Sequence, residues 1–249
     1  MYSTRPVPAA IAHRGLHHHA PENSIPAFRA ALEAGAEGIE LDVHATSDGQ
    51  IYVHHDAVPK AVDRSGILAS RPFAKVTSEY VAQLEVSPGV AIPRLDDAIE
   101  EIATRGELYI EIKAKNAEHA VAQCLRRHDR AISRCAIHSF DHRIARRMVG
   151  LIPSLRVGVL QVSYPIDSPA VLRSSGASDL WQHTDFIDAA LVADVASCGG
   201  RVIAWTSNDS AQWESLKELG VAAICTDRVD DYVRSVREER AGHGQPEKS

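Results

Sequence analysis

The chain contains 249 residues, 45% of them hydrophobic and 24% charged, with a formal net charge of −6. That length permits one large α/β barrel or two small domains, and the acidic balance excludes a general nucleic-acid binder, which would carry a basic stripe. No apolar run is long enough to span a membrane, and residues 1–8 lack the apolar segment of a signal peptide. We therefore expect a cytoplasmic protein without a membrane span.

The cysteines indicate the same compartment. The four thiols, Cys124, Cys135, Cys198 and Cys225, form no C-x-x-C pair, and two of them lie in apolar runs. Buried free thiols are typical of a reducing environment, so we expect no disulfide framework.

Short apolar runs alternate with Ala-, Leu- and Glu-rich stretches along most of the chain. The predicted strands are 9–12, 38–42, 51–53, 108–112, 135–138, 156–160, 179–182, 202–205 and 223–225. The predicted helices are 24–34, 94–104, 117–127, 141–149, 189–197, 210–219 and 230–239. This alternation predicts a parallel sheet, either a closed (β/α)8 TIM barrel or an open doubly wound sheet.

The nine predicted strands are one more than an eight-stranded barrel needs, and the segment after the third strand departs from the alternation of strands and helices. Residues 51–53 come after the Asp48-Gly49 turn signal, so they are expected to return as a hairpin. Residues 57–93 contain no clear strand and are interpreted as a small insertion or lid. We expect a single catalytic domain over 1–239, with a disordered tail over 240–249.

The second strand carries an unusual pair of acids. Glu40 and Asp42 alternate with Leu41, so both carboxylates point to the same face of an otherwise apolar strand. Two carboxylates in that position repel each other and are costly to bury. A bound divalent cation would make the arrangement favourable.

Further polar residues follow other strands, and the ends of parallel strands meet at one edge of the sheet, where active sites lie. Three acids on strand ends suit a hard cation such as Mg²⁺ or Ca²⁺, two separated histidines suit acid–base catalysis, and Arg and Lys suit a phosphate. The residues concerned are His13, Arg14, Glu40, Asp42, His55, Asp56, Glu111, Lys113, Trp205 and Asp227.

Several other histidines could belong to a metal or catalytic site. The run His17-His18-His19 resembles a metal-binding tract, but it precedes Pro21 in a turn and is expected to be solvated. His54 and His55 face opposite sides of an extended chain, so at most one can enter a site. A zinc site is disfavoured, because the chain has neither an H-E-x-x-H motif nor a cysteine cluster.

Taken together, the motifs resemble those of the glycerophosphodiester phosphodiesterase family. They occur in the family's order over residues 11–228, and they are His13-Arg14-Gly15, Pro21-Glu22-Asn23-Ser24, Glu40-Leu41-Asp42, Asp48-Gly49, His55-Asp56, Ile92-Pro93-Arg94-Leu95, Glu111-Ile112-Lys113, Ser139-Phe140, Trp205-Thr206 and Thr226-Asp227. Two features depart from the pattern: Ser24 replaces the family's threonine, and the segment after His55-Asp56 diverges, which leaves the alcohol specificity open.

The resemblance implies a TIM barrel that hydrolyses glycerophosphodiesters to glycerol 3-phosphate and an alcohol. It implies a divalent cation on Glu40, Asp42 and Glu111, and an acid–base pair formed by His13 and His55. The implied substrate-binding residues are Arg14, Lys113, Trp205 and Glu22. His138, Trp181 and His183 are additional pocket candidates from their positions near strand ends.

Two alternatives stay open at this point. A related phospholyase, resembling sphingomyelinase D, would stop at a cyclic phosphate. A non-catalytic barrel would only bind glycerophosphodiesters or a partner. Retention of Pro21-Glu22-Asn23-Ser24 favours the hydrolase over the phospholyase, and the presence of all five central residues disfavours a non-catalytic barrel. The order of the two histidines in catalysis is not determined by the sequence.

Overall fold

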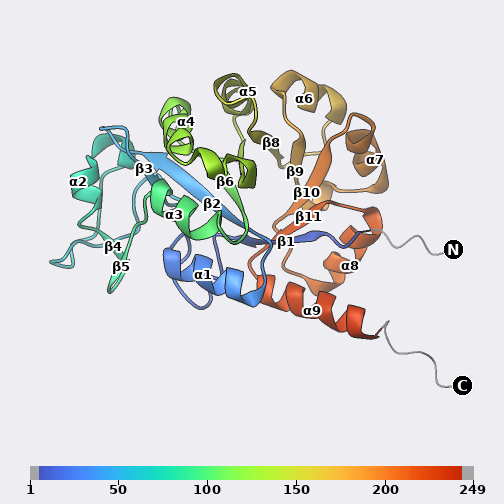
Figure 1. Ribbon diagram of the computed structural model, residues 1–249, viewed down its shortest axis with the longest axis horizontal. Helices are drawn as coiled ribbons and strands as arrows, with labels where there is room; N and C mark the ends of the chain where they lie inside the picture. Colours follow the sequence, from blue (N-terminus) through green and yellow to red (C-terminus); the bar gives the residue numbers. More distant parts are fainter. Residues whose placement is uncertain (1–5, 243–249) are drawn as a thin grey trace, which may run out of the picture.

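Eight parallel strands close into a barrel in the computed structural model, which describes residues 6–242 (Figure 1). The barrel strands are β1 (Ala9–His13), β2 (Gly38–Ala45), β6 (Glu107–Ile112), β7 (Cys135–Ser139), β8 (Arg156–Gln161), β9 (Asp179–His183), β10 (Arg201–Trp205) and β11 (Ala223–Thr226). Strand β1 pairs with β11 on one side and with β2 on the other. This closure confirms the TIM barrel and excludes the open sheet.

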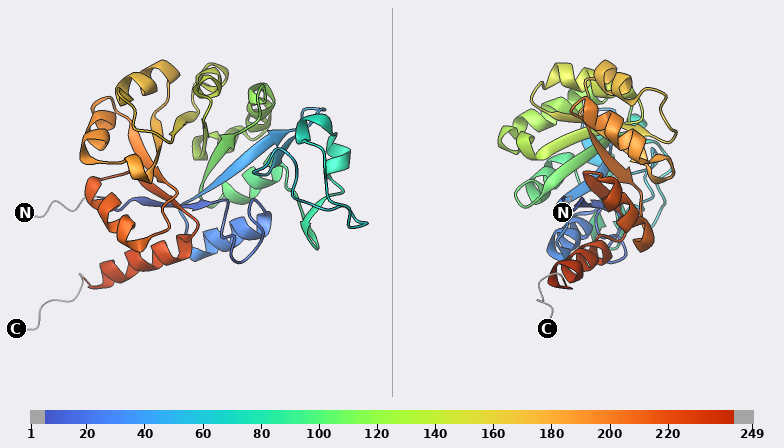
Figure 2. Two further views of the ribbon diagram at one scale, coloured as in Figure 1. Left: turned by 180° about the vertical axis from the view of Figure 1, so that it is seen from behind. Right: turned by 90° about the vertical axis from the view of Figure 1, so that its right-hand side faces the viewer.

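Helices surround the barrel, as both views of Figure 2 show. They are α1 (Ile25–Ala34), α3 (Leu95–Ile102), α4 (Glu118–Arg127), α5 (His142–Leu151), α6 (Ser168–Ser175), α7 (Ala189–Ser197), α8 (Ser210–Leu219) and α9 (Val229–Gly242). Short 3₁₀ helices, η2 (Asp129–Arg134) and η3 (Thr184–Phe186), join some of them to the strands. These helices bury apolar residues against the strands, which gives the largest of the three hydrophobic clusters of the described residues.

Helix α1 begins and ends where the sequence indicates. The Ser24 side chain accepts a hydrogen bond from the Ala27 N–H, and Pro26 occupies the first turn, where its missing N–H costs nothing. Gly35 ends the helix with a φ of 105°, a left-handed conformation that favours glycine.

Helix α6 was not among the predicted helices. Its sequence, SPAVLRSS, is rich in serine, which competes with the backbone for hydrogen bonds and lowers helix propensity. Asp167 caps its first turn by accepting from the Ala170 N–H, and Gly176 ends it with a φ of 72°. The two caps, with burial of Leu172 against the barrel, define a helix that composition alone does not reveal.

The surplus strand is a hairpin return, as predicted. Strand β3 (Ile51–Val53) pairs antiparallel with the end of β2, across a turn in which Gly49 has a φ of 79°. The following segment contains η1 (Phe73–Lys75), α2 (Ser78–Val81), β4 (Glu85–Ser87) and β5 (Val90–Ala91). It lies beside the barrel in Figure 1 and has a small core of its own, so the prediction of no strand between 57 and 93 was wrong.

Large rings fill the inside of the barrel below its mouth. Tyr109 and Trp181 are buried there, with their ring centroids 5.4 Å apart. Gly38 and Gly158 leave room for them, because a Cβ at either position would lie 2.7 Å from the tyrosine or tryptophan ring. These rings form a rigid floor beneath the strand ends.

Three further expectations concern the thiols, the membrane and the tail. Cys124, Cys135 and Cys225 are buried, and none of the four thiols is in a disulfide. None of the described helices combines the length and apolar character needed to cross a membrane. The predicted tail starts at residue 240, but α9 continues to Gly242, and the rest of the tail lies outside the described residues.

Phe73 attaches the insertion to the barrel through two histidines. It stacks on His44 with a centroid distance of 5.4 Å and packs on His54 at 5.7 Å. His54 Nε2 accepts a hydrogen bond from the Lys60 N–H at 3.1 Å, which requires the neutral ring. Burial lowers the pKa of His54 from 6.5 to about 4.

This lowered pKa makes stability depend on pH. As the pH falls, His54 takes up a proton in the unfolded chain at a higher pH than in the folded protein. The contribution of neutral His54 to the free energy of unfolding is therefore complete above pH 6.5 and is lost as the pH falls toward 4. The contribution is at most on the order of 3 kcal/mol. Urea unfolding at several pH values should show a shallower acid loss in His54→Gln than in the wild type, whereas the exposed His119→Gln should behave like the wild type. Equal losses in all three proteins would contradict the assignment.

Candidate active site

A cavity of about 250 Å³ opens at the C-terminal ends of the barrel strands. It is lined by His13, Arg14, Glu40, His55, Glu111, Lys113, His138, Phe140, Leu160, Trp181, Trp205 and Cys225. Seven of the nine predicted site residues are in this set. The other two lie next to it: Asp42 is buried behind Arg14 and Lys113, and Glu22 contacts Arg14 from the exposed side.

The turn after β1, which positions Arg14, depends on unusual backbone angles. Arg14, Gly15 and Asn23 have φ values of 57°, 83° and 55°. At Gly15 a Cβ would lie 2.7 Å from the backbone of Ala27, so only glycine fits. The Arg14 N–H donates to the carbonyl of Glu40 at 2.9 Å, and the Asn23 N–H donates to the carbonyl of Arg14 at 3.0 Å. The turn therefore fixes Arg14 beside the acidic strand.

Asn23 has a role that the sequence reading did not assign. Its Nδ2 donates to Asp42 Oδ2 at 2.9 Å, and its Oδ1 accepts from the Asp42 N–H at 3.3 Å. An asparagine amide supplies both a donor and an acceptor, so it can fix the backbone and the carboxylate of one aspartate together. The proline-glutamate-asparagine motif signalled this loop, but the contact spans two elements and has no local signature.

Asp42 is the best-compensated acid of the site. Arg14 Nε lies 3.0 Å from its Oδ2, and Lys113 Nζ lies 3.5 Å from its Oδ1. Burial opposes ionisation, but these two cations and the Asn23 hydrogen bond outweigh it and hold the pKa of Asp42 below its usual value. Asp42 is therefore ionised at neutral pH.

The pKa of Glu111 is shifted in the opposite direction to that of Asp42. It pairs with Asp42 in the register between β2 and β6, and Lys113 Nζ is 3.3 Å from its Oε1. Burial and the charge of Asp42 raise the pKa of Glu111 to about 7, despite Lys113. Glu111 is thus a carboxylate that lacks sufficient positive charge.

The acidic cluster fits a cation. Glu40, Glu111 and His138 are buried, and their ligand atoms all lie within 4.8 Å of one another. Glu40 Oε2 and Asp42 Oδ1 have no hydrogen-bond partner although both atoms are buried. Buried carboxylate oxygens that accept no hydrogen bond are rare unless a cation satisfies them, and oxygen donors suit Mg²⁺ or Ca²⁺. Asp42 lies next to this group through Lys113 and Arg14, rather than within it.

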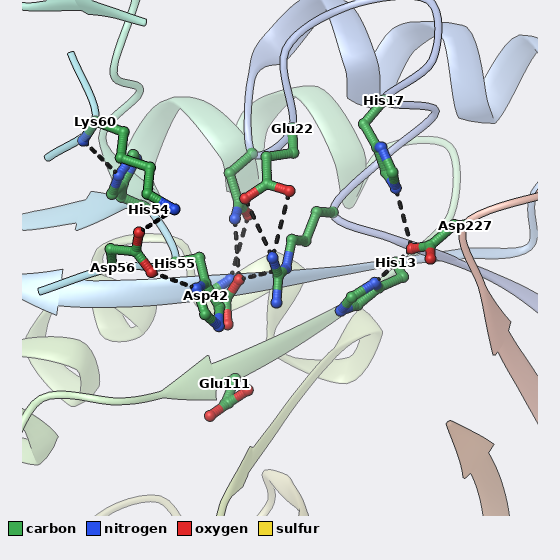
Figure 3. Close-up of polar contacts among 12 residues, drawn as sticks. His13, His17, Glu22, Asp42, His54, His55, Asp56, Lys60, Glu111 and Asp227 are labelled. Atoms are coloured by element: carbon green, nitrogen blue, oxygen red, sulfur yellow. Dashed lines mark hydrogen bonds and ion pairs between the residues drawn. The ribbon is translucent and has the colours of Figure 1, made fainter. Parts of the chain in front are cut away.

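Two histidines reach the cavity, each held by a carboxylate (Figure 3). His13 Nδ1 lies 2.6 Å from Asp227 Oδ1, and His55 Nδ1 lies 2.7 Å from Asp56 Oδ1. In each ring the carboxylate fixes the proton on Nδ1 and leaves Nε2 for the cavity. His13 Nε2 is 3.9 Å from Glu40 Oε2.

The two histidine–carboxylate dyads, His13–Asp227 and His55–Asp56, have different surroundings. Burial opposes protonation of His13, but the hydrogen bond to Asp227 and the charge of Glu40 raise its pKa above 6.5. Asp56 bonds to Lys60 Nζ at 2.6 Å as well as to His55, and these bonds lower its pKa to about 2. His13 is therefore biased toward its charged form.

The remaining histidines of these motifs lie outside the cavity. His54 and His44 pack on Phe73, so only His55 of the pair enters the site, as expected. His44 Nε2–H donates to the His55 carbonyl at 3.0 Å and supports that loop from behind. His17 Nε2 lies 3.0 Å from the Asp227 carboxylate oxygen that holds His13.

Aromatic side chains form the other wall. The Trp205 ring contacts the rings of Phe140 and His183 edge-to-face, with centroid distances of 5.5 Å and 5.6 Å. His138 stacks on Trp181 at 4.1 Å with an interplanar angle of 14°. Of the additional pocket candidates, His138 and Trp181 line the cavity, whereas His183 supports Trp205.

Comparison with known proteins identifies the family of this chain. Residues 13–231 match the model of the glycerophosphoryl diester phosphodiesterase family. The chain is 30% identical over 241 residues to a glycerophosphodiester phosphodiesterase of Caldanaerobacter subterraneus, covering 91% of this chain and 97% of that protein.

Solved structures agree in fold. A glycerophosphodiester phosphodiesterase from Parabacteroides distasonis superposes with a TM-score of 0.81 at 25% identity, covering 95% of this chain and 99% of that one. A phosphodiesterase from Oleispira antarctica, solved with the product sn-glycerol-3-phosphate, gives 0.80 at 24% identity, covering 95% and 98%. The chain belongs to the glycerophosphoryl diester phosphodiesterase family and is an enzyme of that family.

Proposed function

We propose that this chain hydrolyses glycerophosphodiesters to glycerol 3-phosphate and an alcohol, using a divalent cation and the histidines His13 and His55. The main supporting observation is the pair of carboxylate-held histidines that reach one cavity beside a cluster of under-compensated buried acids. The family match and the relative from Caldanaerobacter support the substrate class.

The cation, Mg²⁺ or Ca²⁺, would be held by Glu40, Asp42 and Glu111. When bound, it neutralises phosphate charge and favours ionisation of an attacking hydroxyl. Arg14 and Lys113 lie beside the same acids and would bind the phosphate oxygens. Glu22 contacts Arg14 Nη1 at 3.1 Å and would keep the guanidinium in place.

The proton transfers follow from the two dyads. His55 accepts the proton of the glycerol hydroxyl next to the phosphate as that oxygen attacks phosphorus. His13, biased toward its charged form, donates a proton to the departing alcohol oxygen as the P–O bond breaks. The product of this first half of the reaction is a cyclic phosphate.

Ring opening reverses the roles. A water molecule loses a proton to His13 as it attacks phosphorus, and His55 returns its proton to the glycerol oxygen that leaves. Both histidines regain their starting states, so glycerol 3-phosphate is released without net change in the protein. Trp205 and Phe140 provide an apolar wall against which the glycerol or the alcohol can lie.

The substrate assay tests the reaction and the cation together. We expect glycerol 3-phosphate from at least one of glycerophosphocholine, glycerophosphoethanolamine and glycerophosphoinositol with Mg²⁺ or Ca²⁺, and loss of activity with a chelator. Accumulation of a cyclic phosphate alone would indicate a phospholyase, and binding without turnover would indicate a non-catalytic barrel. Activity that is indifferent to chelator would contradict the cation assignment.

Removal of either histidine should almost abolish turnover. His13→Ala and His55→Ala are each expected to lower kcat by ~10²–10⁴, the usual contribution of one acid–base group. The exposed His119→Ala, on helix α4, serves as the matched control and should keep wild-type kcat. A variant at position 13 or 55 with near-normal kcat would remove that residue from the mechanism.

The assignment of His13 as the acid can be tested by pH dependence. The rate should fall as the pH rises through the pKa of His13, because the proton to be donated is lost. Asp227→Asn removes the partner that raises this pKa, so the alkaline limb of the profile should move to lower pH. Asp231→Asn, which affects a carboxylate paired with Arg228 and Arg234, should leave the limb in place. Movement of the acid limb instead would reverse the roles of His13 and His55.

A further inference from the structure

The histidine tract after β1 resembles a metal-binding motif, and the proposed catalysis does not use its His18 and His19. The His19 N–H donates to the Leu16 carbonyl at 3.1 Å, so the tract forms a turn rather than a strand. Consecutive side chains in a turn need not alternate in direction. His17 points to Asp227, while His18 and His19 project beyond it and are exposed.

His18 and His19 meet Asp230, which lies in the first turn of α9. His18 Nε2 is 3.4 Å from Asp230 Oδ2, and the two imidazole centroids are 4.7 Å apart. Ligand atoms of all three residues lie within 4.8 Å of one another. Asp230 Oδ1 is itself buried and has no hydrogen-bond partner.

The surroundings leave Asp230 available. The neighbouring Asp231 pairs with Arg228 and Arg234, so these arginines are directed to Asp231. A carboxylate oxygen and two imidazole nitrogens therefore lie close together at the surface.

We propose that His18, His19 and Asp230 form a second metal site, for a borderline transition-metal ion such as Zn²⁺. Two imidazoles and one carboxylate are a common three-ligand set for Zn²⁺, with a fourth position left for water. The inner cluster is dominated by carboxylate oxygens and suits Mg²⁺ or Ca²⁺, so the two sites differ in the ions they favour. The proposal does not depend on the proposed catalytic function.

An ion at this site would connect the loop after β1 to the first turn of α9, which are distant in sequence. Asp227, which holds His13, lies three residues before Asp230, in the segment between β11 and α9. Binding to the folded state alone would raise its thermal stability, because the unfolded chain separates the ligands.

The test is Zn²⁺ titration of the chelator-treated full chain by calorimetry, with melting temperature as a second readout. We expect the double variant His18→Gln/His19→Gln to bind one equivalent of Zn²⁺ fewer than the wild type and to lose the Zn²⁺-dependent rise in melting temperature. Both side chains are exposed, so the variant should keep its fold. Unchanged stoichiometry would overturn the proposal.

Single variants separate a built site from adventitious binding by surface histidines. Asp230→Asn should weaken this Zn²⁺ equivalent by at least ~10-fold, as loss of a ligand does. Asp231→Asn and His119→Gln are matched controls and should leave the affinity unchanged. If Asp230→Asn binds Zn²⁺ as tightly as the wild type, the two histidines act alone and the three-residue site is refuted. Co²⁺ absorption gives an independent check, since its visible bands should change in Asp230→Asn.

Discussion

Buried negative charge at the ends of two neighbouring strands is the constraint on which the rest of the site depends. Glu40, Asp42 and Glu111 are buried beside the cavity at the C-terminal ends of the barrel strands, where ionised carboxylates are costly without compensation. Arg14 and Lys113 stabilise Asp42, but they do not satisfy Glu40, and they leave the pKa of Glu111 raised. The cation and the phosphate that we propose for this site would offset that cost. The turn at Gly15 and the amide of Asn23 are built around the same acids.

The sequence was sufficient for features with a local or periodic signature. Alternation of apolar runs and helices predicted a parallel sheet, and the family resemblance of the motifs selected the closed barrel over the open sheet. The spacing of Glu40 and Asp42 predicted that both carboxylates share a face. The hairpin return of β3 followed from Asp48-Gly49. Each of these depends on residues close in the chain, so pattern and propensity are enough.

Features that depend on long-range packing could not be predicted from the sequence. The contact between His13 and Asp227 spans 214 positions, and neither residue indicates the other. The insertion acquires its strands and helix by packing on Phe73, although its own sequence has weak periodicity. Helix α6 forms because its caps and the barrel surface override a serine-rich composition. In each case tertiary structure decides between local alternatives that the sequence leaves nearly equal in energy.

The contact between His13 and Asp227 has a consequence for biosynthesis. His13 belongs to the first barrel strand and Asp227 follows the last, so the dyad is assembled only where the two ends of the sheet meet. A nascent chain on the ribosome that has not yet exposed β11 lacks the carboxylate that fixes the imidazole tautomer. The histidine–carboxylate pair that we propose for catalysis is therefore absent until the ring of strands is complete.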